Sequence, residues 1–368
     1  MRIGLVVPGG VDPSAEYRVI PALLALIRGL ARAHDVRVFA LHQQAQPAQW
    51  ELLGVPVWNI GTRHTRRRAL RTICAQQRLR PFDLLHAIWS GTPGLVAVTA
   101  ARLLRVPSVV HVAGGELVAM PDITYGGRLS WRGRLREAIV LKAATAVSAA
   151  SGPMIAALAA LGIAARRVPL GVDLECWPPR APVRRSVRQP GQLIHVASLN
   201  PVKDQPTLLR SLLALRQRGL DFRMRIVGED TLRGAIQALT QRLGLGGCVS
   251  FDGFLPQRSL RPLVEAADVM VISSRHEAGP LVLHEAAVAG VPTVGTAVGE
   301  IADWAPQAAL AAPVGDPAAL AAQVAALLGD EELRLRIAHE AWRRATRENA
   351  DSTAAAFGAL YATVLTRG

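Results

Sequence analysis

The chain has 368 residues, of which 50% are hydrophobic and 19% are charged. This length predicts two domains, each large enough to bury its own core, and the composition excludes an intrinsically disordered chain. The three cysteines, Cys74, Cys176 and Cys248, are odd in number and far apart, which argues against a disulfide framework or a metal site and favours a reducing, cytoplasmic location.

The net charge of +14 is unevenly distributed. Residues 1–180 carry 22 Lys and Arg against 10 Asp and Glu, a net +12, whereas residues 181–368 carry 20 against 18, a net +2. Two arginine clusters stand out: Arg63, Arg66, Arg67, Arg68 and Arg71, and then Arg128, Arg132, Arg134 and Arg136. Such clusters form either a solvated face or a contact with an anionic membrane surface or lipid-diphosphate acceptor, and both interpretations stay open. Nucleic acid is disfavoured, because aromatic residues are few and no stacking pattern is present.

The first half of the chain alternates short apolar segments with segments of helical periodicity. Strands are expected at 2–7, 36–41, 55–60, 84–88, 108–112 and 144–148, and helices at 19–33, 66–78, 94–104, 125–141 and 153–161. This alternation is typical of a doubly wound parallel sheet, in which ligands bind where strands end. Gly9 and Gly10 follow the first strand and would allow a ligand close to the backbone, although many such turns bind nothing. His111 is expected at the ligand side of its strand, although a lone histidine there is more often structural.

The second half repeats the alternation after a stretch rich in proline and arginine, 177–191, that is expected to link two domains. The expected strands cover 192–197, 223–227, 249–251, 267–272 and 291–294, and the expected helices cover 206–218, 231–243, 258–266, 281–289, 317–328, 331–348 and 352–365. The predicted fold class is therefore α/β, with domains at 1–176 and 192–348. No GxGxxG follows the first strand, which argues against a dinucleotide enzyme.

The segment around residues 273–304 carries the chemistry. A buried strand leads into a polar loop, and Gly279 and Pro280 then open a helix whose free N–H groups and dipole favour an anion such as a diphosphate. Glu277 and Glu285 flank this helix start eight residues apart. Exposed helix glutamates are common, but Glu285 sits in the apolar run LVLHEAAVAG, and a carboxylate there can accept two hydrogen bonds from a ribose diol.

A lysine in the second domain is a further candidate. The chain has 40 arginines and only two lysines, Lys142 and Lys203. Lys203 lies in the loop after the first strand of the second domain, where a compact point charge differs from the planar charge of arginine. The alternative is an ordinary surface lysine.

The motif EAGPLVLHEA, with its two glutamates, resembles the donor-sugar signature of the family-4 retaining glycosyltransferases, and GVPTVGTAVGEIADW resembles the strand and loop that follow it. The resemblance runs from about residue 1 to 365 and is most specific over 196–304. It implies the GT-B fold, with two Rossmann-like domains facing a central cleft and a C-terminal helix, about 349–368, that packs back on the first domain.

The resemblance also implies a role for each matching residue. Glu285 would bind the donor ribose, Glu277 the sugar hydroxyls and Lys203 the departing diphosphate, with His111 near the reacting carbons. Gly9 and Gly10 would form a loop in the cleft. The other implied donor-binding residues are Ser198, Gly228, Phe254, Leu255, Arg275, Ala278, Gly279, Pro280, Leu281 and Val282.

The function implied is transfer of a hexose from a UDP- or GDP-sugar to a glycan or lipid-linked acceptor, with retention and without a metal or other cofactor, in cell-envelope or exopolysaccharide biosynthesis. No secretory signal is expected, because residues 1–7 read directly as a strand; the expected location is cytoplasmic, with peripheral association at the inner face of the membrane as an alternative. Ser198 stands where many members have an arginine, and Arg275 is a candidate to replace that charge. The alternatives are an inactive nucleotide-binding partner subunit, or a sugar phosphorylase or epimerase of the same fold.

Overall fold

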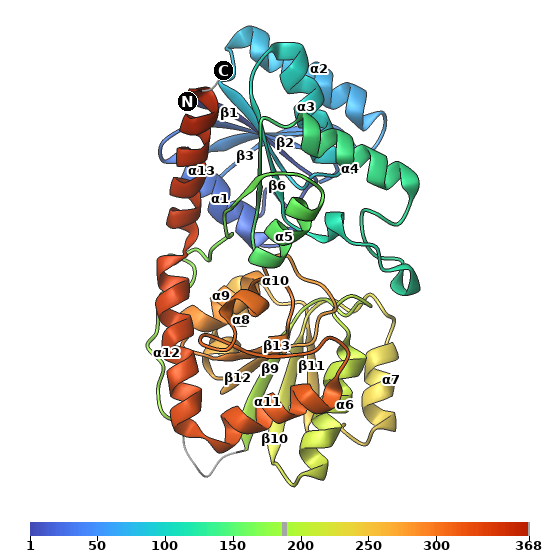
Figure 1. Cartoon of the computed structure of the whole chain (residues 1–368), viewed down its shortest axis with the longest axis vertical. Coiled ribbons are helices and arrows are strands. Elements are labelled where there is room, and N and C mark those ends of the chain that lie inside the picture. Colours follow the sequence, from blue (N-terminus) through green and yellow to red (C-terminus); the bar gives the residue numbers. More distant parts are fainter. Residues whose placement is uncertain (186–189, 367–368) are drawn as a thin grey trace. The chain divides into compact units, whose positions relative to one another are not determined.

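The structure, a computed structural model, describes residues 1–185 and 190–366. The chain divides into two compact units, and each is an α/β layer structure (Figure 1). The first unit comprises Met1–Gly171 together with Ala350–Gly368, and the second comprises Val172–Asn349. The C-terminal helix therefore belongs to the unit that contains the N-terminus.

An eight-stranded sheet forms the centre of the first unit, in the order β3-β4-β2-β1-β5-β6-β7-β8. Its strands are β1 (Arg2–Val7), β2 (Asp35–Ala40), β3 (Ala48–Leu52), β4 (Val55–Asn59), β5 (Leu84–Ile88), β6 (Ser108–Val112), β7 (Ala146–Ala149) and β8 (Ala165–Arg167). Its helices are α1 (Pro21–Ala31), α2 (Thr65–Leu79), α3 (Thr92–Leu104), α4 (Trp131–Ala143), α5 (Gly152–Ala160) and α13 (Ala350–Leu365), with short 3₁₀ turns at Gly115–Leu117 and Pro121–Ile123. All neighbouring strands are parallel except β3 and β4, which form an antiparallel hairpin.

Helix α13 closes one face of this sheet. It packs along α1, and its buried side chains Phe357, Leu360, Tyr361 and Val364 join the apolar residues of β1, β2 and α1 in one core cluster. Helices α2 and α3 cover the opposite face, where a separate cluster contains Phe39, Ala69 and Ile73. The sheet is thus buried on both faces, which explains why its central strands are continuous apolar runs.

A six-stranded parallel sheet forms the centre of the second unit, in the order β11-β10-β9-β12-β13-β14. Its strands are β9 (Gly191–Val196), β10 (Phe222–Val227), β11 (Val249–Gly253), β12 (Val269–Ile272), β13 (Thr293–Thr296) and β14 (Leu310–Ala312). Its helices are α6 (Gln205–Gln217), α7 (Ala235–Arg242), α8 (Gln257–Glu265), α9 (Leu281–Val288), α10 (Gly299–Trp304), α11 (Pro317–Gly329) and α12 (Glu331–Arg347). The adjacent strands β9 and β12 bring the loops after them together.

Two expectations about connecting segments need correction. The stretch expected to begin a linker at residue 177 starts inside the second unit, because the Trp177 side chain is fully buried in a core cluster that also contains Val172; residues 186–189 of that stretch lie outside the described residues. The helix expected at 125–141 begins only at Trp131. Ser130 caps it by accepting a hydrogen bond from the N–H of Gly133 at 3.1 Å, and Gly126 before it has a φ of +115°, which ends any earlier helix.

Over 1–185 and 190–366, the structure contains no helix that is both long enough and apolar enough to cross a membrane.

Candidate functional site

The loop between β12 and α9 shows the strand, loop and helix arrangement expected from the sequence. Strand β12 ends at Ile272, and α9 begins at Leu281, with Pro280 as its N-cap and no side chain capping its first turn. The first internal bond of this end runs from the N–H of Leu283 to the carbonyl of Pro280, at 3.0 Å. Because Leu281 and Val282 precede it, their N–H groups are the ones that a helix start leaves for an anion.

The side chains of Lys203 and Glu277 meet in front of this helix. The Lys203 Nζ lies 2.5 Å from the Glu277 Oε1, and the same oxygen accepts a hydrogen bond from Ser274 Oγ at 2.6 Å. The two loops that carry them are tied together, because Ser273 Oγ donates to the Lys203 carbonyl at 2.8 Å and the Arg275 N–H donates to the Val202 carbonyl at 2.7 Å. Their charged groups are therefore held by a fixed framework rather than by free surface chains.

Glu285 lies inside α9 and is only 3% exposed. Its Oε1 accepts a hydrogen bond from Gln257 Nε2, on the first residue of α8, at 3.0 Å. Burial raises the pKa of Glu285 to about 7, and the Gln257 hydrogen bond opposes that shift only in part. A buried carboxyl with one hydrogen-bond donor retains acceptor capacity for hydroxyl groups.

The remaining expected donor-binding residues of the second unit differ in how available they are. Ser198 is exposed, and its carbonyl accepts from Gln205 Nε2 at 3.2 Å. Gly228 has a φ of +151°, and a Cβ there would lie 2.0 Å from the Ala197 carbonyl oxygen, so this loop requires glycine. Phe254 is 52% exposed and Leu255 is half-buried, as are Gly279 and Arg275, while Ala278 is buried.

Two contacts behind the site were not foreseen. His284 Nε2 and Glu300 Oε2 lie 2.9 Å apart and are both fully buried, with the His284 ring edge-on to Trp304. Gly299, at a φ of +50°, lies so close to the loop that a Cβ would be 2.6 Å from the Glu277 carbonyl oxygen. These contacts fix the backbone of the 277–280 loop from below; the GEIADW segment was the only sequence signal for them.

His111 is placed differently from the expectation. Its side chain is 0% exposed, Nδ1 lies 3.0 Å from Ser148 Oγ, and the ring packs edge-on against Phe357 of α13. Burial lowers the pKa of His111 to about 3. Because side chains alternate along a strand, this position of β6 points into the core under α13. The His111 side chain therefore lies in the core of the first unit, and its expected role near the reacting carbons stays a prediction.

The loop at the carboxyl end of β6 is organised by Glu116 instead. Its Oε1 accepts from the N–H of Ser90 at 3.0 Å, and its Oε2 accepts from the N–H of Gly114 at 2.7 Å. After β1, the N–H of Gly10 donates to Gln43 Oε1 at 2.6 Å, and a Cβ on Gly10 would lie 2.5 Å from Ile20 Cγ1. The tight turn at Gly9 and Gly10 thus has an internal packing reason.

Within the described parts of the chain, no group of three or more His, Cys, Asp or Glu side chains is placed to hold a metal ion.

Comparison with known families identifies both halves of the chain. Residues 190–330 match the family model described as glycosyl transferases group 1, and residues 19–172 match the glycosyl transferase 4-like domain. A D-inositol 3-phosphate glycosyltransferase of Corynebacterium glutamicum is 29% identical over 208 residues, which are 52% of this chain and 50% of that protein. The chain thus spans about half the length of the curated relatives that it matches first.

Solved structures show the same fold over the whole chain. A sucrose-phosphate synthase from Thermosynechococcus elongatus has a TM-score of 0.80 at 18% identity, covering 100% of both chains. Anabaena HepE, solved in complex with UDP and glucose, has a TM-score of 0.77 at 19% identity, covering 99% of this chain and 100% of that one. These similarities show the GT-B fold that the sequence predicted.

Proposed function

Because the chain belongs to the group 1 glycosyltransferases of GT-B fold, we propose that it is a retaining enzyme that moves a sugar from a UDP- or GDP-sugar to a glycan or lipid-linked acceptor in cell-envelope or exopolysaccharide biosynthesis. The observation that carries this proposal is the meeting of Lys203 and Glu277 before the start of α9, with Glu285 buried in the same helix. The Lys203 cation and the start of α9 match the diphosphate of a nucleotide-diphosphate sugar, and the two carboxylates match its hydroxyl groups.

Each group has a distinct task in this proposal. The N–H groups at Leu281 and Val282, with Lys203, hold the diphosphate, and the buried Glu285 accepts hydrogen bonds from the ribose hydroxyls. Glu277 accepts from sugar hydroxyls while it keeps Lys203 oriented. Since these donors are already positioned, they stabilise charge as it grows on the leaving diphosphate without reorganisation and without a metal ion.

In the proposed transfer step, negative charge develops on the leaving diphosphate. The bond between the sugar C1 and the diphosphate oxygen breaks, and the electron pair leaves with the diphosphate. The acceptor hydroxyl attacks C1 from the face that the leaving group vacates, and its proton passes to a diphosphate oxygen, so the configuration is retained. Analysis of the product anomer by NMR tests this step, and an inverted anomeric centre would contradict it.

Nucleotide titration is the direct test of the donor site. We expect calorimetry with UDP, GDP and ADP to show selective binding of one nucleotide by the wild type. Glu285→Ala should weaken this binding by at least about tenfold, because the variant lacks the buried carboxylate that accepts two charge-assisted hydrogen bonds from the ribose hydroxyls. Glu340→Ala changes an exposed glutamate on α12 that pairs with Arg343; it is the control and should bind normally.

The acceptor side of the proposal rests on charge. The first unit carries the arginine clusters, and Arg63, Arg66 and Arg67 are exposed on and before α2. We propose that this surface meets an anionic membrane or a lipid-diphosphate acceptor, with the enzyme on the cytoplasmic side.

A second candidate function, a nucleotide-binding partner subunit without activity, is favoured by Ser198 alone, since this exposed residue offers no charge to a diphosphate. Release of nucleoside diphosphate from UDP- or GDP-sugars with acceptor present separates the two functions. Turnover excludes the inactive subunit, whereas tight nucleotide binding without turnover by any donor favours it.

A further inference from the structure

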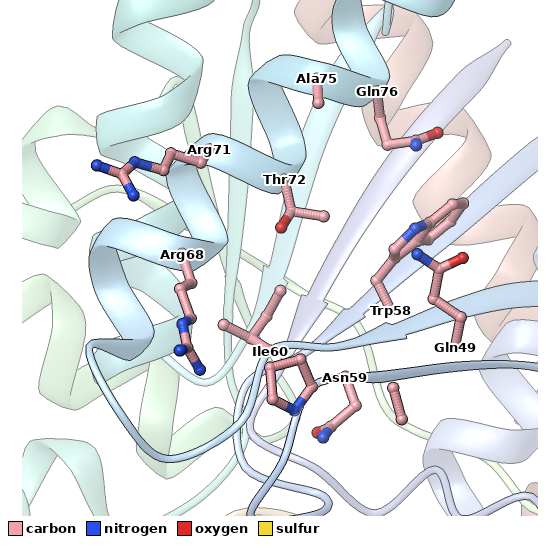
Figure 2. Close-up of a pocket in the computed structure, with 11 residues that line it drawn as sticks. Gln49, Trp58, Asn59, Ile60, Arg68, Arg71, Thr72, Ala75 and Gln76 are labelled. Carbon is pink, nitrogen blue, oxygen red and sulfur yellow. The ribbon is translucent and has the colours of Figure 1, made fainter.

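A cavity of about 720 Å³ lies in the first unit, between α2 and the outer strands β3 and β4 (Figure 2). It exists because the sheet extends further than the helix that covers it. Helix α2 turns Ala69 and Ile73 into the core under it, while the hairpin of β3 and β4 continues to the sheet edge. The next stripe of α2, at the helical spacing of Arg68, Thr72 and Gln76, faces the space left open.

One side of this cavity offers an aromatic ring and amides. Trp58 lies directly across the hairpin from Gln49, and Figure 2 shows both beside Gln76 of α2. One part of the indole is held by Phe39, with ring centroids 5.6 Å apart and planes at 26°. Trp58 is therefore a half-buried, rigid platform. Within the described residues, the side-chain amides of Gln49 and Gln76 make no hydrogen bond to the protein.

The other side of the cavity is positively charged. Arg68 and Arg71 line it from α2, with Arg68 directed to the loop after β4 in Figure 2. No Asp or Glu is among the lining residues. Neither arginine side chain makes an ion pair or hydrogen bond with another residue of 1–185 or 190–366, whereas Arg32, Arg37 and Arg80 of the same unit all pair with aspartates. Two unneutralised arginines at a concave site are the usual arrangement for a carboxylate or phosphate.

We propose that this cavity binds an acidic sugar unit, that is, a pyranose carrying a carboxylate or phosphate. The ring packs on Trp58, its hydroxyls bond to the amides of Gln49 and Gln76 and to the Thr72 hydroxyl, and its anionic group pairs with Arg68. Arg71, whose guanidinium is directed away from Trp58 in Figure 2, adds positive charge at the rim. An aromatic ring contacts the apolar face of a ligand, amides bond to its hydroxyls, and arginine pairs with its charged group. An acidic pyranose has all three features.

This site is separate from the donor chemistry, because every residue assigned to the donor belongs to the second unit and every residue of the cavity belongs to the first. Binding here does not depend on the transfer reaction. A membrane headgroup would need only the arginines, whereas the glutamines and Trp58 point to a saccharide.

The test is titration of the full-length protein with saccharide pairs that differ in charge alone. The first pair represents a glycan chain: the acidic probe is a tetrasaccharide of alternating glucuronic acid and N-acetylglucosamine, and its neutral control is chitotetraose. The second pair represents a sugar phosphate: the acidic probe is glucose 6-phosphate, and its neutral control is glucose. We expect one acidic probe of the two pairs to bind and its neutral counterpart to bind at least about tenfold more weakly. The probe that binds identifies the source as a glycan chain or a sugar phosphate.

Matched variants locate the binding. Arg68→Gln with Arg71→Gln should weaken it at least about tenfold, and Gln49→Ala, at the sheet edge where folding is not at risk, should weaken it about threefold. Arg102→Gln with Arg105→Gln removes the same charge from exposed residues at the end of α3 that do not line the cavity, and should leave binding within twofold. Any of three results would overturn the proposal. They are equal losses of binding in both arginine pairs, no binding of either acidic probe at 10 mM (about the weakest useful affinity), and binding only to phosphatidylglycerol vesicles.

Discussion

Lys203 illustrates why a single residue type matters at the proposed donor site. Arginine is the default cation of this chain, yet a lysine stands in the loop between β9 and α6, with its ammonium 2.5 Å from the Glu277 carboxylate. A compact ammonium can be shared between a carboxylate and a diphosphate oxygen, whereas the planar guanidinium demands a bidentate partner. In the proposed mechanism, the lysine and its glutamate therefore act as one unit that orients the sugar and supports the leaving group.

Lys203→Ala should lower the rate of nucleoside diphosphate release by about 10²–10³-fold, the usual effect of removing one positioned group that stabilises developing charge. Lys203→Arg should recover little of this rate, because its charge has a different shape. Lys142→Ala changes the only other lysine, which is exposed in the first unit, and should leave the rate unchanged. A Lys203→Ala enzyme with wild-type turnover would contradict the assigned role.

Glu285 should make folding stability depend on pH. An unfolded glutamate loses its proton near pH 4.5, whereas the buried Glu285 loses it near pH 7. Between these values the folded state holds more protons, so its stability falls as the pH rises, by up to about 3 kcal/mol. Glu285→Gln removes this penalty. Urea unfolding at pH 5 and pH 8 should show that the unfolding free energy of the variant rises relative to that of the wild type at pH 8. The same difference between the two proteins at both pH values would contradict a buried carboxyl with a raised pKa.

At the scale of elements, the central strands could be predicted to within one or two residues, because burial on both faces leaves short apolar runs between polar turns. The strands missed were β3, β8 and β14, which lie at the edges of their sheets. The β3 segment, AQWEL, alternates exposure and has no apolar run. Helix α10 was missed for a related reason: it is six residues long and starts at a glycine with positive φ and no side-chain cap.

The candidate site also has parts that the sequence predicts and parts that it does not. Lys203, Glu277 and Glu285 lie in short motifs, so sequence could identify them. The contacts of Gln257 with Glu285 and of His284 with Glu300 join segments 28 and 16 residues apart, and no local pattern encodes them. His111 was placed near the site by the resemblance and by its position near a strand end; its contact with Phe357 could not be read from the sequence, and its role stays a prediction.

Helix α13 depends on a buried polar contact with the sheet. The Tyr361 hydroxyl lies 2.7 Å from His86 Nδ1, both groups are fully buried, and Phe357 packs against the rings of His86 and His111. Tyr361→Phe keeps the ring but leaves His86 without its partner, so it should cost about 1–3 kcal/mol of unfolding free energy. Denaturant unfolding measures this, with Thr363→Val on the exposed face of α13 as the control. A loss below about 0.5 kcal/mol would show that the hydroxyl contributes nothing net.

At the scale of the whole molecule, the two halves of the sequence carry different net charges. The net charge of residues 1–180 is +12 and that of residues 181–368 is +2. In residues 181–368 the 20 Lys and Arg are nearly balanced by 18 Asp and Glu, so this half has little excess charge. In the first unit, by contrast, Arg66, Arg67, Arg68 and Arg71 of α2 form no ion pair with any residue of 1–185 or 190–366, and neither the core nor the donor explains them. Charge of this kind acts over a surface and attracts extended anionic partners.

Binding to anionic vesicles should therefore depend on the first unit and on salt. We expect sedimentation with vesicles containing phosphatidylglycerol at 0.1 M salt, no binding to neutral vesicles, and release near 0.5 M salt, where charges are screened over a few ångström. Arg66→Gln with Arg67→Gln should weaken partitioning about 10- to 30-fold, since each basic residue near such a surface contributes about 1 kcal/mol. Arg210→Gln with Arg242→Gln removes the same charge from exposed sites of the second unit and should have little effect. Equal losses in both pairs would mean that total charge, rather than the α2 surface, drives the binding, and binding that ignores salt would rule out an electrostatic contact altogether.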